Sequence, residues 1–590
     1  MAEATNVQPT PDGGAEVTFQ DPQEEQQDAP NQEIRFLIET TNIAEEIQKI
    51  KKLRFPSYFD EEEKLDGEGI LDQIGKVVKD EYKADRLSRS DWEEKVKDAI
   101  KTFTAYLDGE TTNKSRVMLP MVAIAILQFH ARAYDALLPS KEIVSALPTG
   151  SKNPDTLDRA ERVAKYTNYD LLYNMDDFVE GMDASLMQLP LEGSVFRKTF
   201  YDPVTNKNVS QNCSAMDCII NYRANPSNPE RLTHIYDLTT NAIRVRVSKG
   251  MFLDEAWDLK QGDESKGADS EIKAQQDKTD GQQETSQVTK KPRVILEQHR
   301  MWDLNGDGLE EPYVITVDFE TAKVLRITSR RAINALGEEV TVNYFTHYKF
   351  LHNPEGSYGL GFWTFMGHLN EAANALINET IDATHLANVQ GGFINRRSNI
   401  KKGQLRFKRG EFQNVDITGD DIRKSIFSFD FKGPPDAMFR LLGLLFDQAK
   451  LVSSVSDAME GKFPSSDTPA AAIINASEEG RKVFNSIYRR LHRTFSQEVK
   501  KLYILNGVFL DEEKAFTALG QSSRPDAPGG QTLIGRKDFN NAIDLFLVSD
   551  PNITSRGENI TKAEVVYKDV MSFPVTANDL EIVRKAKGRF

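Results

Sequence analysis

Apolar residues recur at helical spacing through much of the first third of the chain. The spacing predicts helices at residues 117–138 and at about residues 155–187. Ser90 and Glu93 form the pattern of a capping box ahead of an apolar stripe, so a further helix is expected to begin at Ser90. Residues 117–127 are the most apolar stretch, but they are too few to span a bilayer. They predict a buried helix, and no contact with a membrane is expected.

From about residue 194 the apolar period shortens from that of a helix to that of a strand. β-Branched and aromatic residues between turn signals predict five strands, at residues 194–200, 217–222, 294–302, 313–327 and 341–349. A helical pattern then returns. Its expected order is a helix at 363–390, a β-like segment at 392–432, a helix at 435–460, a loop rich in Gly, Pro and Ser, and a long helix at 469–505. The pattern predicts an α+β fold that is mainly helical.

Two stretches have too few large apolar residues to form a core. Residues 1–32 are rich in Gln, Glu, Asp and Pro and are expected to form a disordered tail. Residues 260–292 have the same character and are expected to form a flexible insertion in a surface loop. With 590 residues in all, the chain predicts several domains or one elongated subunit with several parts.

The balance of charge is acidic, with 90 acidic and 74 basic residues and a net charge of −16. Proteins that grip DNA phosphates tightly are usually basic, so this balance argues against tight DNA binding. It fits a wall past which DNA slides. The two cysteines, Cys213 and Cys218, give no disulfide framework, and no His/Cys cluster for zinc is expected near them. We expect two buried, free thiols.

Four polar residues recur at every fourth position of the helix expected at 363–390, namely Asn370, Asn374, Asn378 and Asp382. This spacing keeps them on one stripe of the helix surface. A solvated helix face would explain the stripe. Alternatively, neighbouring copies of the helix hydrogen-bond side by side through it, or it forms a polar, uncharged wall.

A basic patch stands out within residues 391–432 of this acidic chain. Its members are Arg396, Arg397, Lys401, Lys402, Arg406, Lys408 and Arg409. Leu405 and Phe407 alternate with the charges, which predicts a hairpin strand with one wet face. An ordinary solvated hairpin would explain the patch. The functional alternatives are a docking surface for an acidic partner and a transient contact with DNA phosphates.

Oxygen-bearing side chains alternate at Asp303, Asn305 and Asp307, with Gly308 in the sixth place of the series. That pattern resembles a calcium loop, although Val314 stands where a bidentate acid is expected. A hairpin turn between two strands explains the same residues. Structural calcium is therefore the one candidate cofactor. The sequence has no phosphate-loop, serine-elbow or zinc-protease motif, which predicts a protein without enzymatic activity.

Several short motifs follow one another along the chain. They are Trp302-Asp-Leu-Asn-Gly-Asp-Gly308 with Glu311-Pro-Tyr313; Tyr358-Gly-Leu-Gly-Phe362; Leu369-Asn-Glu-Ala-Ala-Asn-Ala-Leu-Ile-Asn378 with Asp382 and Gln390-Gly-Gly-Phe393; Gly403-x-Leu-x-Phe407 with Gly410; Arg440-Leu-Leu-Gly-Leu-Leu445; Ser454-x-x-Asp457-Ala-Met459; and Thr468-Pro469. Taken in this order, they resemble the portal (head-to-tail connector) proteins of short-tailed bacteriophages. The resemblance covers roughly residues 90–506, and it rests on the ordered series.

Portal subunits form a closed ring, usually of about twelve copies, at one vertex of the capsid. For this chain the resemblance implies a disordered tail at 1–32, a wing of mixed α/β structure at 33–362, a stem helix at 363–391, a clip at 392–432, a second stem helix at 433–460, a tunnel loop at 461–468, a channel-lining helix at 469–510, and a wing return with the base of a short or truncated crown at 511–590.

The same resemblance implies roles for the candidate residues. The basic patch would dock the terminase large subunit and later the head–tail adaptor, and the stripe of four polar residues would be a seam between stem helices. The tunnel loop would surround the DNA with Lys462, Phe463, Ser465, Ser466 and Asp467. One charge of each sign in that loop suits weak, sequence-independent contact with phosphates.

The implied function is structural. The ring would be a channel of the virion through which double-stranded DNA is packaged and ejected, assembled in the host cytoplasm with the major capsid and scaffolding proteins. Three alternatives stay open at this point. They are another virion connector, such as an adaptor or tail-tube component; a calcium-dependent hydrolase or nuclease built on Asp303, Asn305 and Asp307; and a cellular scaffold protein with a basic docking hairpin.

Overall fold

The computed structural model describes about three-fifths of the chain. The described residues are 6–9, 15–18, 42–47, 69–104, 115–138, 142–149, 153–175, 177–203, 205–225, 229–259, 292–304, 308–333, 339–388, 392–394, 426–428, 433–453, 470–512, 514–516, 532–539 and 543–548. Helices account for about half of them, and strands and loops make up the rest, so the fold is mixed α/β. None of the described helices combines the length and the apolar character that crossing a membrane requires.

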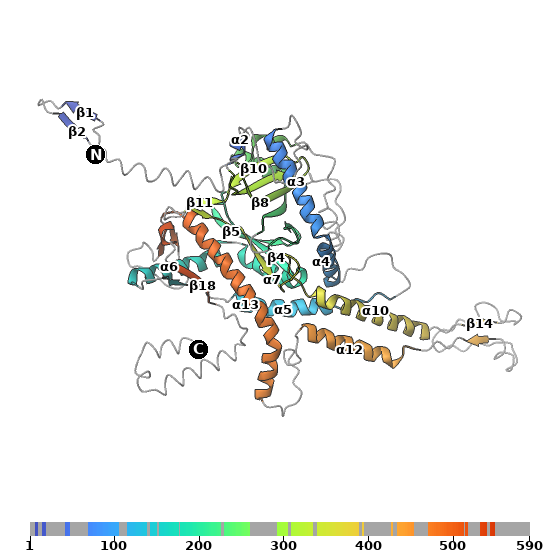
Figure 1. Ribbon diagram of the computed structural model, residues 1–590. Coiled ribbons are helices and arrows are strands. Elements are labelled where there is room, and N and C mark those ends of the chain that lie inside the picture. Colours follow the sequence, from blue (N-terminus) through green and yellow to red (C-terminus); the bar gives the residue numbers. More distant parts are fainter. Residues whose placement is uncertain are drawn as a thin grey trace, which may run out of the picture.

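A five-stranded antiparallel sheet lies in the upper part of Figure 1, with α3 beside it. Its strands are β6 (Cys218–Ile219), β7 (Arg231–Leu238), β8 (Arg293–Trp302), β9 (Glu311–Asp318) and β10 (Val324–Ser329), in the order β10-β9-β8-β7-β6. α3 (Ile70–Ser88) buries Ile74 and Val78 in one apolar cluster with Ile315 and Val317 of the sheet. Full burial of each such side chain contributes about 1.5–3 kcal/mol relative to exposure.

A second antiparallel sheet holds the middle of the molecule. Its strands are β13 (Phe345–Lys349), β4 (Ser194–Asp202) and β5 (Lys207–Ser214), in that order across the sheet. Helices α7 (Phe178–Glu192) and α13 (Ala470–Phe509) pack on it, and α5 (Met121–Leu137) packs on both helices. The largest apolar core lies here, with the ring of Phe129 stacked on that of Tyr488. The chain passes from β5 to β6 through residues 215–217, so one short turn joins the two sheets.

The second half of the chain follows the predicted order. α10 (Trp363–Asn388), α12 (Asp436–Ser453) and α13 confirm the three helices expected there. Between the first two, β14 (Gly392–Ile394) and β15 (Ile426–Ser428) pair in antiparallel fashion.

The strand predictions hold in part. All five predicted segments contain strands, but residues 313–327 form two, β9 and β10, that turn back on each other. Residues 341–349 likewise contain the end of β12 (Glu339–Thr341) and the separate strand β13. β5 and β7 were not predicted. β5 is mostly polar, and its buried positions are Asn208, Ser210 and Cys213, so no alternation of apolar residues marks this strand in the sequence.

The single helix predicted at about residues 155–187 is wrong. α6 (Pro154–Tyr169) continues into a π-helical turn, η2 (Asp170–Asn174), and α7 begins only at Phe178. Asn174 donates its side-chain amide to Asp170 at 2.7 Å, and Met175 is extended. A local side-chain hydrogen bond of this kind competes with continuation of the helix.

Two details of the N-terminal helices also differ from expectation. α4 (Ser90–Phe103) begins as predicted, but Arg89 occupies the N-cap position and no side chain caps the helix. The capping box is therefore wrong, and Ser90 Oγ bonds to Asp91 instead. The helix expected at 117–138 begins only at Met121, with Pro120 at its N-cap, and residues 115–120 form neither helix nor strand.

The other elements are short. They are β1 (Asn6–Pro9), β2 (Ala15–Thr18), α2 (Ala44–Ile47), β3 (Val144–Pro148), α8 (Thr240–Ser248), η3 (Asp254–Asp258), β11 (Arg331–Ile333), β16 (Lys514–Phe516), β17 (Thr532–Ile534), η5 (Arg536–Asp538) and β18 (Ile543–Leu547). β1 and β2 pair within the segment expected to be a disordered tail. β18 pairs with β3, which joins the C-terminal part of the described chain to its N-terminal third.

Close backbone contacts between glycines lead the chain into α10. Gly193, which ends α7, has φ +81°, a left-handed conformation that favours glycine. A Cβ on Gly359 would lie 2.3 Å from the Gly193 carbonyl oxygen, and a Cβ on Gly361 would lie 2.7 Å from that of Leu191. No side chain fits at either position. This explains both glycines of the Tyr358–Phe362 motif, and it fixes the point from which α10 leaves the body.

Candidate functional site

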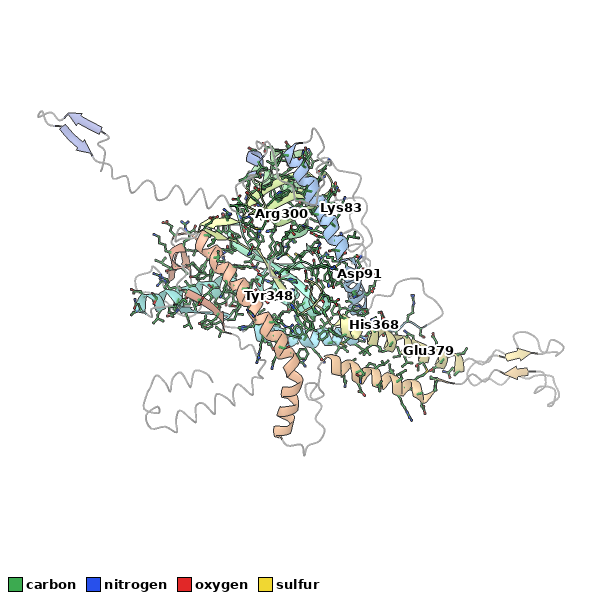
Figure 2. All side chains as sticks on the ribbon, viewed as in Figure 1. Lys83, Asp91, Arg300, Tyr348, His368 and Glu379 are labelled. Atoms are coloured by element: carbon green, nitrogen blue, oxygen red, sulfur yellow. The ribbon has the colours of Figure 1, made fainter. Side chains whose placement is uncertain are left out.

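Two helices extend from the body of the molecule side by side. Figure 1 shows α10 and α12 running together away from α5, with the β14–β15 pair beyond their far ends. Their 26 and 18 residues correspond to lengths of about 39 and 27 Å. In Figure 2, His368 and Glu379 lie along the projecting α10, whereas Tyr348 lies inside the body. The chain therefore has an arm of two helices and a small sheet.

The polar stripe of α10 binds an extended segment of the same chain. The backbone N–H of Val117 donates to Asn378 Oδ1 at 2.6 Å, and that of Leu119 donates to Asn374 Oδ1 at 2.7 Å. Asn378 returns a bond from its Nδ2 to the Val117 carbonyl oxygen at 3.0 Å. One step further out, Ser115 N donates to the carboxylate of Asp382 at 2.8 Å.

The spacing of the stripe matches the spacing of its partner. Two residues of an extended chain rise by about 6.6 Å, and four residues of a helix rise by about 6.0 Å. Alternate N–H groups of residues 115–119 can therefore meet every fourth side chain of α10. Three members of the stripe use their oxygens in this way, so a solvated face does not account for them. A seam between copies stays a prediction.

Asn370, the fourth member of the stripe, lies in a different environment. It is 1% exposed, and neither atom of its side-chain amide has a hydrogen-bond partner among the described residues. The next residue in register is Met121, where the extended segment has ended and α5 has begun. The stripe therefore changes at its base from a backbone-binding surface to a buried amide.

α12 leaves several large apolar side chains exposed to solvent. Leu442, Leu445 and Phe446 pack against the core, but the large side chains of Phe439, Leu441 and Leu444 remain about half exposed. The neighbouring helices also expose large apolar side chains, at Ile124 and Leu127 of α5 and at Phe365 and Leu386 of α10. A solvent-exposed helix normally carries polar residues on its outer side. Apolar groups gathered on one arm instead indicate a surface for a partner.

α13 has an apolar face and a polar face where its side chains are described. Ile487, Leu491, Phe495 and Leu502 are buried at helical spacing. Arg489 and Arg493 are exposed on other faces of the helix.

The clip and tunnel-loop candidates lie outside the described residues. These are the basic patch Arg396, Arg397, Lys401, Lys402, Arg406, Lys408 and Arg409, and the loop residues Lys462, Phe463, Ser465, Ser466 and Asp467. The insertion expected at 260–292 lies outside the described residues except for Pro292. The predictions for these segments are therefore neither confirmed nor contradicted.

The candidate calcium loop connects two paired strands. β8 and β9 form a hairpin with Trp302 opposite Glu311, so the strands expected on either side of the loop are confirmed. Asp303 is buried, and its Oδ2 accepts the N–H of Gly308 at 2.9 Å. Asn305 and Asp307 lie outside the described residues. The carboxylate of Asp303 thus closes the turn, and calcium binding stays a prediction.

Arg89 is a buried centre that the sequence pattern did not reveal. Its guanidinium donates to the carbonyl oxygens of Ala215 (2.7 Å), Met216 (2.6 Å) and Cys218 (3.0 Å), to Tyr358 Oη (2.8 Å) and to Glu93 Oε1 (2.8 Å). These partners come from α4, from the turn between the two sheets and from the Tyr358–Phe362 motif. A lone arginine before a helix gives no such signal in the sequence, because all of its partners except Glu93 lie more than a hundred residues away.

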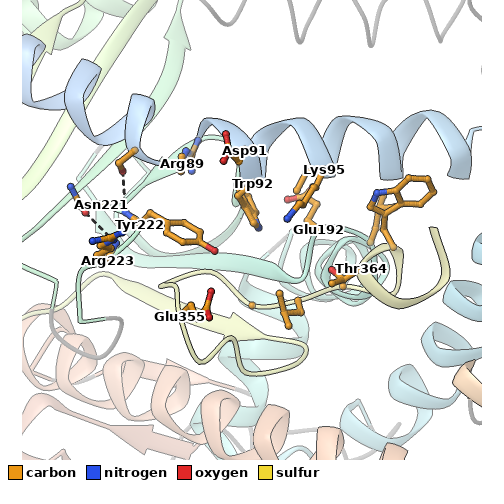
Figure 3. Close-up of a pocket in the computed structure, with 17 residues that line it drawn as sticks. Arg89, Asp91, Trp92, Lys95, Glu192, Asn221, Tyr222, Arg223, Glu355 and Thr364 are labelled. Atoms are coloured by element: carbon orange, nitrogen blue, oxygen red, sulfur yellow. Dashed lines mark hydrogen bonds between the residues drawn. The ribbon is translucent and has the colours of Figure 1, made fainter. Parts of the chain in front are cut away.

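A cavity of about 780 Å³ lies beside Arg89, between α4 and the chain that leads into α10. Figure 3 shows Arg89, Trp92 and Lys95 along the α4 side, with Glu355 across from them. Glu192, from the end of α7, also lines the cavity. Its Oε2 accepts from Ser214 Oγ and Ala215 N, but burial outweighs these bonds and raises its pKa to about 7.

Replacing Glu192 by Gln is expected to flatten the pH dependence of stability. The folded protein holds this proton up to about pH 7, whereas the unfolded chain releases it near pH 4.5. In the wild-type protein the free energy of unfolding should therefore fall by about 3 kcal/mol between these pH values and level off above them. Glu192→Gln should lack this fall. Urea midpoints measured from pH 5 to pH 8 report the effect. Glu355→Gln, an exposed carboxylate at the same cavity, should keep the wild-type profile, and an unchanged profile in Glu192→Gln would contradict the assignment.

Both cysteines are free and buried, as expected. The expectation that no cluster of His and Cys lies near them is wrong, however. His234 of β7 lies beside Cys213 and Cys218, because the sheets bring together residues that are separate in the sequence.

The chain matches no protein-family model and no curated protein. Its function is therefore inferred from its own residues and their arrangement.

Proposed function

We propose that this chain is the subunit of a bacteriophage portal ring. The ring would stand at one vertex of the capsid and form the channel through which double-stranded DNA is packaged and later ejected. In this proposal the chain is a structural protein of the virion and has no catalytic role. It docks the terminase large subunit during packaging and the head–tail adaptor afterwards.

The projecting arm is the observation that carries the proposal. α10 and α12 leave a mixed α/β body together and carry β14 and β15 beyond their ends. The 40-residue helix α13 follows them in the chain. This is the order of stem, clip, second stem and channel helix that the sequence motifs imply. The glycine contacts that position the start of α10 involve the same motif series.

The exposed apolar side chains of the arm support assembly into a ring. A head-to-tail contact between identical copies closes into a ring when the rotation between them fits. Such a contact would bury Phe439, Leu441 and Leu444 of each copy against its neighbour. These side chains are already about half buried, so each would gain roughly half of the about 1.5–3 kcal/mol that full burial contributes. They would therefore stabilise the contact between copies without supplying all of its free energy.

The charge of the chain suits a channel that DNA must pass without being held. The net charge of −16 disfavours tight binding to phosphates. The basic patch at residues 396–409 departs locally from this balance. In the proposal it lies at the tip of the arm, beyond β14, and docks acidic surfaces of the motor and of the adaptor. DNA itself would meet only the weak, sequence-independent contacts of the tunnel loop.

The first test is the mass and symmetry of the purified protein. Native mass spectrometry and negative-stain class averages should give a ring of about a dozen copies with a central hole. Leu441→Glu with Leu444→Glu should leave a folded subunit that no longer forms rings, because both side chains lie on the exposed side of α12. Circular dichroism of the variant should match that of the wild type.

The matched control is Leu87→Glu. Leu87 is even more exposed than Leu444, at 75%, but it lies at the end of α3 and away from the arm. Rings of Leu87→Glu should form normally. A wild-type protein that stays monomeric at every concentration, or rings that form unchanged with both α12 substitutions, would contradict the proposal.

A further inference from the structure

Two thiols and one imidazole meet inside the molecule. The sulfur atoms of Cys213 and Cys218 and a ring nitrogen of His234 all lie within 4.8 Å of one another. All three side chains are buried. Ligands of a tetrahedral zinc ion are about 3.8 Å apart, given Zn–S bonds of about 2.3 Å. Small rotations of the side chains would therefore suffice to place all three around one ion.

The backbone holds these residues from two different sheets. Cys213 lies on β5 of the three-stranded sheet, whereas Cys218 and His234 lie on β6 and β7 of the five-stranded sheet. Cys218 and His234 are directly opposite each other in the β6–β7 register, so they point to the same face. The turn that joins the sheets is held by Arg89, which binds the carbonyl oxygens of residues 215, 216 and 218. The ligand positions are thus set before any ion binds.

One ring nitrogen of His234 makes no hydrogen bond to the described residues. This atom, Nδ1, is buried. A buried polar atom without a partner costs free energy, and an ion or a water bound there would remove that cost. His234 also lines a second cavity of about 320 Å³, on the side of the five-stranded sheet. This is roomy enough for a water molecule to reach the cluster.

We propose that Cys213, Cys218 and His234 bind a zinc ion that ties the two sheets together. Two thiolates and one imidazole form a ligand set that zinc favours, and a water from the cavity can complete its tetrahedral shell. The unfolded chain does not bring the three residues together, so binding adds to the stability of the folded state. The site would join the sheets beside the short turn of residues 215–217, where the chain passes from β5 to β6.

Cobalt gives a direct test on the wild-type protein. Untagged protein is purified under reducing conditions without chelator, and its zinc content is measured by mass spectrometry. The apoprotein, made by dialysis against a chelator, is then titrated with Co²⁺. The expected result is one metal ion per chain, with a thiolate-to-cobalt charge-transfer band and intense visible bands of tetrahedral cobalt. The chain has two cysteines in all, so a charge-transfer band can arise only from Cys213 and Cys218.

Variants identify the ligands. Cys213→Ser, Cys218→Ser and His234→Gln should each weaken cobalt binding by at least about 10-fold, and the cysteine variants should also lose most of the charge-transfer band. The matched control is His299→Gln. His299 is also buried and also has an unpartnered Nδ1, but it lies on β8 outside the cluster. Its variant should bind cobalt with unchanged affinity.

The wild-type spectrum decides the outcome even if a variant fails to fold. Reduced protein that contains no zinc and shows no charge-transfer band at saturating Co²⁺ would overturn the proposal. Titration of both thiols in the denatured protein confirms that they were reduced. The melting temperature of the apoprotein should rise when Zn²⁺ is added in stoichiometric amount. No rise in the wild type, or an equal rise in Cys213→Ser, would also count against the site.

Discussion

Replacing Glu498 by Gln is expected to lower the free energy of unfolding by about 3–5 kcal/mol. Glu498 lies on α13 and is fully buried. Its carboxylate accepts from Arg197 Nε at 2.9 Å, from Ser210 Oγ at 2.5 Å and from Tyr348 Oη at 2.5 Å. The substitution keeps the shape of the side chain but removes its charge. The guanidinium of Arg197, which is itself fully buried, then lies inside the protein without a counter-charge.

The effect is measured as a shift in the urea midpoint and in the melting temperature. The double variant Arg197→Met with Glu498→Leu is the informative partner, because it removes both charges and leaves no charge buried alone. It should recover much of the loss, and a double-mutant cycle with the single variants Arg197→Met and Glu498→Leu gives the coupling between the two residues. A loss in Glu498→Gln of less than about 1 kcal/mol would show that the pair is not the buried link between α13 and β4.

Replacing Arg89 by Met is expected to cost a similar amount, about 3–5 kcal/mol. Met fills much of the space but donates no hydrogen bond. Three backbone carbonyls of residues 215–218, the hydroxyl of Tyr358 and the carboxylate of Glu93 would lose a donor together. Arg89→Lys should also destabilise the protein, because a single ammonium group cannot donate to all the acceptors that surround the planar guanidinium.

The control for Arg89 is its neighbour Arg86. Arg86 pairs with the other carboxylate oxygen of Glu93 at 3.6 Å and bonds to Tyr82 Oη, but it is only partly buried. Arg86→Met should cost less than about 1 kcal/mol. Hydrogen exchange gives a second readout, since the amides of residues 214–220 should lose protection in Arg89→Met. Normal protection there together with wild-type stability would contradict the central role of Arg89.

The long helices could be predicted from the sequence because local spacing decides them. α10, α12 and α13 each carry apolar residues at helical spacing for several turns, and the structure places them close to the predicted bounds. The prediction at residues 155–187 failed where a side chain competes with the backbone, at Asp170 and Asn174. The capping box at Ser90 failed for a related reason, because Glu93 pairs with the buried Arg89.

Only the part of the candidate site that lies within a single helix could be predicted from the sequence. The four-residue stripe of α10 is visible in the sequence, but its partner at residues 115–119 lies more than 250 residues away. Nothing in the local pattern points from one to the other. His234 was missed for the same reason, since the register of β6 and β7 brings it to Cys218. The spacing of residues indicates which face of a helix or strand carries the functional side chains. The tertiary structure determines which residues that face contacts.

The pairing of β18 with β3 determines when, during synthesis, the subunit can finish folding. Val144 lies opposite Leu547, so about 400 residues of chain separate the two strands. A ribosome adding about 5–20 residues per second makes β3 roughly 20–80 s before its partner. Until then the edge of β3 stays unpaired, and the largest core lacks Ile543, Leu545 and Leu547. The nascent subunit therefore carries an open strand edge for most of its synthesis, and folding of its main core ends only after β18 has left the ribosome.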